Sequence, residues 1–182
     1  MGLDMYLTKK TYVKQWSFQN ENERVTVSVT KNGERLKGIN PERIAYIEEE
    51  VMYWRKANQI HNWFVTNIQK GNDNCGTYYV DSDMLQQLVD KCKQALDVIN
   101  NASITSTRIK TGWNKDGETY ADINTFDCAD EIEDILPPTS GFFFGGTEID
   151  EYYKQDLVDT IDKLEALLAE EGSSDFYYHS SW

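Results

Sequence analysis

The sequence has few of the residues that build metal centres or cross-links: three cysteines, two histidines and three prolines among 182 residues. Cys75, Cys92 and Cys128 lie far apart, and no two of them form a CxxC pair. Zinc sites draw on closely spaced Cys and His ligands, so we expect no metal site. An odd number of scattered cysteines, with no signal-peptide pattern at the start, favours reduced thiols in a cytoplasm.

Long apolar runs and clusters of basic residues are missing too. No stretch approaches the ~18 apolar residues of a membrane-spanning helix, and there is no Lys/Arg run. Eighteen basic and 31 acidic side chains give a net charge of −13, which repels the phosphates of nucleic acids. We therefore expect neither a membrane nor double-stranded nucleic acid as a partner. A basic protein partner is compatible with this charge.

Sequence motifs of catalysis and cofactor binding are also missing. The chain has no GxxxxGK[ST], GxGxxG or GxSxG motif and no EF-hand spacing. Acidic residues gather in 127–134, where a solvated helix face is the simpler interpretation. We expect no cofactor and assign no catalytic residue, although an enzyme acting on nucleotides through His61 stays open as a weaker alternative.

What is present is typical of a globular protein, with 40% hydrophobic and 13% aromatic residues. The length favours a single domain spanning 1–182. Residues 3–7 and 25–30 alternate apolar and polar side chains, and the second stretch runs into Asn32-Gly33, a strong hairpin signal. We expect these strands to form a small antiparallel sheet, with the aromatic tail 174–182 pairing with it or covering the core.

Three main helices are expected to pack on this sheet, which makes the fold class α+β. The longest is predicted for Asn40 to Lys70, with Asn40-Pro41 at its start and Gly71 at its end. Two more are predicted from Ser82 to Asn101 and from Thr147 to Gly172. Shorter features are an extended segment at 77–80, a hairpin turning at Asp116-Gly117, an acidic helix at 127–136 and an aromatic loop at 140–147.

The predicted long helix contains most of the candidate binding residues. At 100° per residue, Trp54, Asn58 and His61 fall on its apolar side. Arg55, Met52 and Trp63 fall on its outer side, where the two apolar residues need a cover such as a second layer or a homodimer partner. Polar groups in a core cost about 1–3 kcal/mol unless they find partners. Asn58 and His61 are therefore either a satisfied core pair or the wall of a ligand pocket.

The second candidate is Gly145-Gly146-Thr147, which the helix prediction places at the start of the last helix. Free backbone N–H groups and the helix dipole favour an anion at such a position. A capping pair formed by Thr147 and Asp150 is the structural alternative, and acidic residues already follow in the first turn.

Several strings spread over the chain resemble a family of small, uncharacterised phage and prophage proteins. They are MGLDMYL, YWRKANQIHNWF, CGTYYV, SGFFFGGTEIDEYY and the terminal SSW. Members of that family are sometimes labelled phosphoglycerate kinase, which 182 residues without a phosphate-loop motif do not support. The resemblance implies a viral accessory protein in the cytoplasm of a bacterial host, and it transfers no site residues.

Two functions follow as hypotheses. In the first, the protein binds a nucleotide-like or phosphorylated small molecule without turning it over and sequesters a host immune signal. Trp54 would stack the base, His61, Asn58 and Arg55 would bind polar and phosphate groups, and the segment Gly145–Thr147 would hold an anion. In the second, the acidic surface around Asp127–Asp134 occludes a basic surface of a host defence protein.

Overall fold

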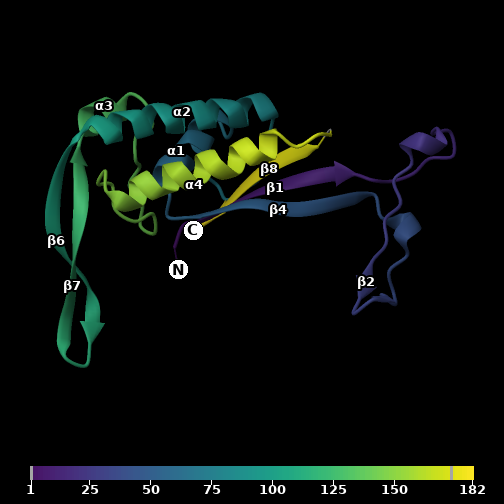
Figure 1. Cartoon of the computed structure of the whole chain (residues 1–182), viewed down its shortest axis with the longest axis horizontal. Coiled ribbons are helices and arrows are strands. Elements are labelled where there is room, and N and C mark those ends of the chain that lie inside the picture. Colours follow the sequence, from purple (N-terminus) through teal and green to yellow (C-terminus); the bar gives the residue numbers. More distant parts are fainter. Residues whose placement is uncertain (1, 173) are drawn as a thin grey trace.

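A computed structural model describes residues 2–172 and 174–182 and contains a four-stranded antiparallel sheet in the order β4-β1-β8-β5 (Figure 1). β1 (Asp4–Tyr12) and β8 (Asp175–Ser181) form its centre, and β4 (Tyr46–Arg55) and β5 (Thr77–Val80) form its edges. The N-terminal strand thus pairs with the C-terminal strand, as the alternation at one end and the aromatic tail at the other predict.

One face of this sheet is apolar and the other is not, because successive side chains of a strand point to opposite faces. Leu3, Met5 and Leu7 are fully buried, and so is Tyr178, which lies opposite Leu7. Between them, Tyr6 and Thr8 point the other way and are half-buried. The buried face forms the core with the helices, and the other face is left open.

Three longer helices cover the apolar face: α1 (Asn58–Asn67), α2 (Ser82–Asn101) and α4 (Glu151–Leu168). Asp81 caps α2 by accepting a hydrogen bond from the backbone N–H of Met84. A short helix, α3 (Ala129–Glu133), follows the β6–β7 hairpin described below. The predicted α+β class is confirmed, as are the helix from Ser82 to Asn101 and the extended segment 77–80.

Two arms extend beyond the ends of the sheet, and parts of both reach to the side away from the helices (Figure 1). The hairpin arm consists of β6 (Ser103–Asn114) and β7 (Gly117–Asp127), and it turns at Asp116-Gly117 as predicted. The N-terminal arm, residues 14–44, contains two single-turn 3-10 helices, η1 (Glu21–Glu23) and η2 (Pro41–Arg43), and the pair β2 (Thr30–Lys31) and β3 (Glu34–Arg35). Asn32-Gly33 does form a turn, but of this separate pair, so residues 25–29 are not a strand of the main sheet.

The predicted helix from Asn40 to Lys70 is wrong. Its first half is η2 and strand β4, and helix α1 begins only at Asn58. Lys9 and Lys10 of β1 lie opposite Glu49 and Glu48 of β4, so pairing with a distant strand decides the conformation of this segment. Lys56, with a φ of +61°, then breaks the strand before the helix starts.

The predicted outward position of Met52 and Trp63 is wrong as well. Met52 and Trp63 are 3% and 7% exposed and belong to the core, so neither needs a homodimer partner as a cover.

The last helix also begins later than predicted, at Glu151 rather than Thr147, because Asp150 accepts hydrogen bonds from the N–H groups of Tyr152 and Tyr153. Within the described residues, no helix is long and apolar enough to cross a membrane.

Candidate functional site

Asn58 is buried at the start of α1, and its amide group fastens the loop that connects α3 to α4. Its Nδ2 donates to the carbonyl oxygens of Gly146 at 2.7 Å and Phe144 at 3.3 Å. Its Oδ1 accepts a hydrogen bond from the N–H of Thr139 at 3.0 Å. Asn58 therefore satisfies backbone groups at both ends of residues 139–146 and ties that loop to α1.

His61 is fully buried one turn later, and both of its ring nitrogens have partners. Nδ1 lies 2.7 Å from the hydroxyl of Tyr178, and Nε2 lies 3.1 Å from Oδ2 of Asp73. The other oxygen of Asp73 accepts a hydrogen bond from Nε1 of Trp182. Asn58 and His61 are thus buried polar residues whose hydrogen-bonding groups have partners within the protein. His61 also forms part of a cavity wall.

Trp54 is 3% exposed and lies inside the core. Its indole Nε1 donates a hydrogen bond to the hydroxyl of Thr160 at 2.8 Å, and its ring contacts Phe64 edge-on. With its ring covered in this way, Trp54 has no free face on which a ligand could stack. The predicted role of Trp54 therefore finds no support in its position.

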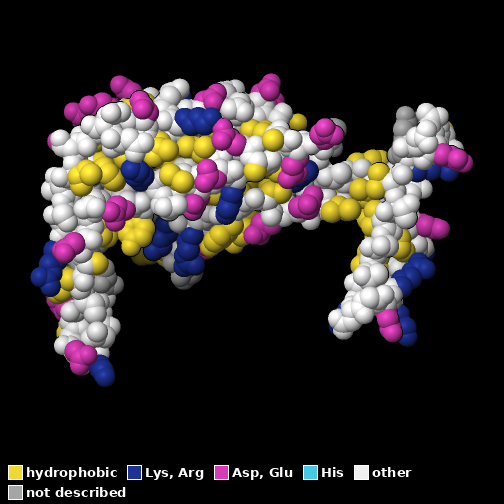
Figure 2. Space-filling view, in the orientation of Figure 1, with side chains coloured by type: hydrophobic (Ala, Val, Ile, Leu, Met, Phe, Trp, Pro, Cys, Tyr) yellow, Lys and Arg dark blue, Asp and Glu magenta, His cyan; other side chains and the backbone are white. Residues whose placement is uncertain are grey.

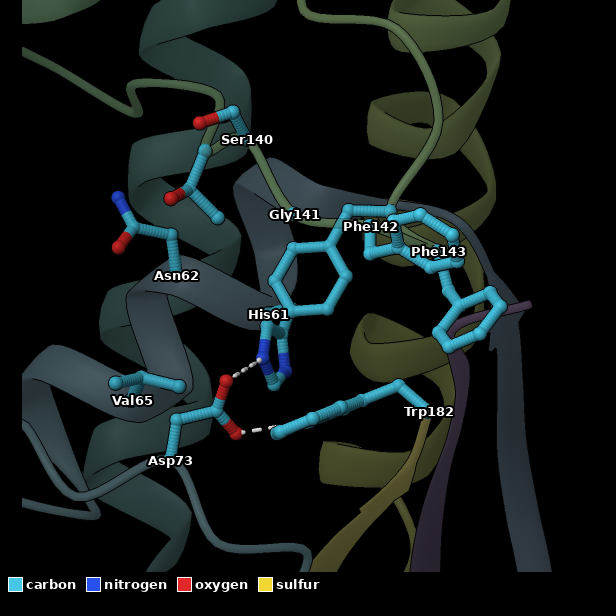
Figure 3. Close-up of a pocket in the computed structure, with 11 residues that line it drawn as sticks. His61, Asn62, Val65, Asp73, Ser140, Gly141, Phe142, Phe143 and Trp182 are labelled. Atoms are coloured by element: carbon cyan, nitrogen blue, oxygen red, sulfur yellow. Dashed lines mark hydrogen bonds and ion pairs between the residues drawn. The ribbon is translucent and has the colours of Figure 1, made fainter.

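A cavity of about 400 Å³ opens beside His61. Figure 3 shows Asp73 and Trp182 together on one side of His61 and the aromatic loop on the other. Three parts of the chain that are far apart in the sequence line the cavity: α1 with the loop after it, the 139–144 loop and Trp182. The lining residues are His61, Asn62, Val65, Asp73, Thr139, Ser140, Gly141, Phe142, Phe143, Phe144 and Trp182. We call this cavity the aromatic pocket.

Two of the phenylalanines in the 139–144 loop are placed very differently. Phe144 is buried and lies edge-on to His61 with ring centres 5.0 Å apart. Phe142 is 92% exposed at the rim of the pocket. Gly141 is needed for this arrangement, since a Cβ there would come within 2.6 Å of the Phe144 ring. The loop thus fixes one ring in the core and presents another to solvent, an exposure that needs a reason.

A second cavity lies on the other side of the loop and brings several predicted site residues together. Arg55, Asn58, Gly145 and Gly146 all line it, with Lys56 beside them. Three carboxylates also line it: Glu148, Asp150 and Asp156. The carboxylates outnumber the two cations, and therefore the cavity is poorly suited to a phosphate.

Asp156 is the unusual carboxylate of this second cavity. Burial raises its pKa to about 7, with further increases from the charges of Asp159 and Asp150. Gln59 offsets part of that rise by donating a hydrogen bond to Oδ2 at 3.1 Å. The raised pKa is accounted for by desolvation in the helix layer, so it does not by itself indicate catalysis.

Gly145, Gly146 and Thr147 do not form the predicted anion site at the start of the last helix. They precede the helix by several residues, and the carboxylate of Asp150 occupies the first free N–H groups instead. Thr147 lines a separate shallow cavity with Pro138. The capping alternative is thus closer to what is observed, with Asp150 rather than Thr147 as the cap.

The thiols and carboxylates show no catalytic or metal-binding arrangement in the described part of the chain. Burial raises the pKa of the Cys92 and Cys128 thiols, which disfavours the reactive thiolate. No group of three or more Cys, His, Asp or Glu among residues 2–172 and 174–182 is placed to hold a metal ion. The acidic residues around α3 are exposed.

Sequence reasoning missed most of the aromatic pocket. The sequence predicts an aromatic loop at 140–147, but nothing in it shows that Phe144 is buried and Phe142 exposed. Asp73 and Trp182 were not considered, because nothing local to either residue shows that the loop after α1 meets the chain end. The aromatic tail 174–182, which is short of charge, was the available signal. Comparisons of the chain with protein-family models, curated proteins and solved structures found no match.

Proposed function

We propose that the protein binds a small molecule with a flat, nucleobase-like ring in the aromatic pocket and does not transform it. The observation that carries the proposal is the exposed ring of Phe142 at the rim of a cavity of about 400 Å³ that also contains the Trp182 ring. Ligand pockets are concave and largely apolar, with a few polar groups that orient the ligand. Asn62, Ser140 and Asp73 would be those groups here.

Stacking is the main source of affinity in this proposal. A base stacked on an aromatic side chain is worth about 1–3 kcal/mol, and Phe142 and Trp182 offer two such rings. Asp73, whose side chain is 26% exposed, would accept a hydrogen bond from a ring N–H or an exocyclic amine. These features favour the base part of a nucleotide over its phosphates.

The phosphate part of the original hypothesis has weaker support. In the described structure the wall of the aromatic pocket contains no Lys or Arg. Arg55 and Lys56 line the second cavity, where Glu148, Asp150 and Asp156 oppose an anion. We therefore propose a nucleoside-like ligand, or a nucleotide whose phosphates extend into solvent, in preference to a ligand recognised through its phosphates.

Binding without turnover is proposed because His61, the candidate acid or base, is committed to structure. Both nitrogens of His61 have partners within 3.1 Å. Tyr178 is buried, and burial raises the pKa of its hydroxyl well above the usual value, so it is a poor nucleophile and a poor general acid. A general base needs a free position toward its substrate, which His61 lacks in this arrangement.

The biological setting is also a proposal. The resemblance to small phage and prophage proteins suggests that the chain acts in the cytoplasm of a bacterial host. A non-catalytic binder of a nucleobase-containing molecule would there lower the free concentration of a host immune signal and so protect the phage.

The experiment is to purify the full chain from phage-infected cells, denature it, and identify the small molecules that are released by mass spectrometry. The proposal predicts an intact ring-containing compound in about one-to-one amount with the protein. Recovery of the folded protein without such a compound from cells in which the defence is active would contradict it. Turnover of added nucleotides would favour the enzyme alternative instead.

A further inference from the structure

The open face of the main sheet carries an unusual number of aromatic side chains. Residues that pair directly across antiparallel strands share a face, so the register identifies its members. Tyr6 lies between Tyr53 of β4 and His179 of β8, and Tyr177 of β8 lies beside Tyr79 of β5. Ring centres in these pairs are 5.3 to 6.1 Å apart. Tyr177 and His179 are two residues apart on β8, which puts the two groups of rings next to each other on one face. We call it the tyrosine face.

This face already holds one cation. The ammonium group of Lys10 lies 4.8 Å from the ring centre of Tyr46 and 5.9 Å from that of Tyr177. Lys9, its neighbour, points to the helix side and pairs with Glu170. Cation–π contacts are worth about 0.5–1 kcal/mol at exposed sites, and Lys10 makes them with Tyr46 and Tyr177 at one end of this face.

Carboxylates accompany the tyrosines. Glu48 lies opposite Lys10 and Glu50 opposite Thr8, so both belong to the tyrosine face, and both are exposed. Asp4 and Asp175 join them from β1 and β8. The tyrosine face therefore has four carboxylates and two cationic side chains, Lys10 and Arg55, and it is acidic like the whole protein, whose net charge is −13. Such a field steers cationic partners toward the surface and repels anionic ones.

The two arms border this face. The hairpin arm at one end and the β2–β3 part of the N-terminal arm at the other extend past the sheet on its open side, whereas the purple part of the N-terminal arm lies level with the helices (Figure 1). Each arm exposes aromatic rings: Phe18 is 81% exposed and Trp113 is 70% exposed. Tyr, Trp and Phe are enriched at the centres of protein interfaces. The molecule thus presents a concave, aromatic and acidic surface that a macromolecule could enter.

We infer that the tyrosine face docks an arginine- or lysine-rich segment of a partner protein. The aromatic rings would bind the guanidinium or ammonium groups of this segment by cation–π contacts, and Glu48 and Glu50 would form ion pairs with them. Stacking rings could in principle also accept the bases of a single-stranded nucleic acid, but the face has only two cations for phosphates and twice as many carboxylates. Charge therefore selects the basic protein segment.

This surface is distinct from the acidic cluster around α3 that the sequence suggested. Residues 128–172 contain 13 acidic and two basic residues. The acidic residues around α3 are exposed, and Figure 2 shows Asp and Glu side chains scattered over the helix layer. That layer offers charge without a concave aromatic surface. The contrast supplies a control, because equal charge changes can be made on the two sides of the molecule.

The test uses a fluorescently labelled arginine–glycine repeat peptide and the full-length protein, with binding followed by anisotropy. Glu48→Gln/Glu50→Gln removes two charges from the tyrosine face, and Glu131→Gln/Glu133→Gln removes two charges from α3. Tyr79→Ala removes an edge-strand ring that is 56% exposed, with Tyr79→Phe as the variant that keeps the ring. Circular dichroism verifies that each variant is folded.

We expect saturable binding that weakens about five- to tenfold in Glu48→Gln/Glu50→Gln and stays within about twofold in Glu131→Gln/Glu133→Gln. Tyr79→Ala should weaken binding about threefold and Tyr79→Phe should restore it, which corresponds to about 0.7 kcal/mol for one exposed cation–π contact. Equal losses in the two charge variants would show attraction by net charge alone and would overturn the inference. Absence of peptide binding, or displacement of the peptide by oligouridine, would also overturn it.

Discussion

His61 and Asp73 are linked through a contact of 3.1 Å between Nε2 and Oδ2. The second oxygen of the same carboxylate accepts a hydrogen bond from Trp182 at 3.1 Å. Asp73 therefore connects a fully buried histidine of α1 to the last side chain of the protein. Asp73 thus joins two walls of the aromatic pocket, which are formed by His61 and Trp182.

Replacing Asp73 by alanine should lower the free energy of unfolding by about 1–3 kcal/mol, because it leaves a buried nitrogen of His61 without a partner. Trp182→Phe keeps an aromatic ring and removes only the indole N–H, so its cost should stay below about 1 kcal/mol. Urea denaturation of both variants measures the difference. An equal cost for the two would mean that the His61 contact contributes nothing to stability.

Asn58→Ala should destabilise the protein by about 2–4 kcal/mol, because three hydrogen bonds to the 139–146 loop are lost at a buried position. Hydrogen exchange should accelerate at the amides of that loop. Asn62→Ala is the control, since the Asn62 side chain makes a single bond to the carbonyl oxygen of Pro137. Unchanged exchange in Asn58→Ala would show that other contacts hold the loop.

Asp156→Asn should stabilise the protein above pH 7. The pKa of this carboxyl is about 7 in the folded state and about 3.8 for an unperturbed aspartate, so between those pH values the folded state binds the extra proton. Stability is therefore lost as pH rises from about 4 to 7. Asparagine can still accept the hydrogen bond from Gln59 without ionising.

Thermal unfolding from pH 5 to 8 measures this effect. Wild type should lose about 1–3 kcal/mol of stability over that range through Asp156, and Asp156→Asn should lose less. Asp159→Asn, a change at an exposed neighbour, should leave most of the pH dependence in place. A pH dependence that is the same in wild type and Asp156→Asn would exclude this carboxyl as its source.

Elements with their own local signals could be predicted from the sequence. Asp116-Gly117 turns the hairpin arm, and the apolar spacing from Ser82 predicts α2. The segment Asn40–Lys70 could not be predicted in this way, because Ile47, Val51 and Trp54 recur at helical intervals by chance. In β4 these residues belong to a strand whose register shifts opposite Leu7 and Thr8, and the pairing partner is about 40 residues away.

The candidate site was predicted only in part, for a related reason. Burial of Asn58 and His61 follows from their apolar neighbours in α1, a pattern that survives within the shorter helix. The partners of His61 come from Asp73 and from Tyr178, which is 117 residues away. A pocket assembled from three distant parts of the chain leaves no local pattern in the sequence. No local pattern indicates the exposure of Phe142 either.

Phe142 allows the most direct test of the proposed ligand pocket, with Phe18 as a matched control. The two phenylalanines are 92% and 81% exposed, and each contacts one neighbouring aromatic ring. Either change to alanine should alter the free energy of unfolding by no more than about 0.5 kcal/mol. The two positions differ in that Phe142 lines the aromatic pocket and Phe18 lies in the N-terminal arm.

The measurement is the amount of ring-containing small molecule that is released from wild type, Phe142→Ala and Phe18→Ala after parallel purification from infected cells. Loss of about 1–3 kcal/mol of stacking predicts that Phe142→Ala retains at least about fivefold less of the compound under limiting ligand. Phe18→Ala should retain as much as wild type. Equal retention by all three proteins would contradict binding in the aromatic pocket.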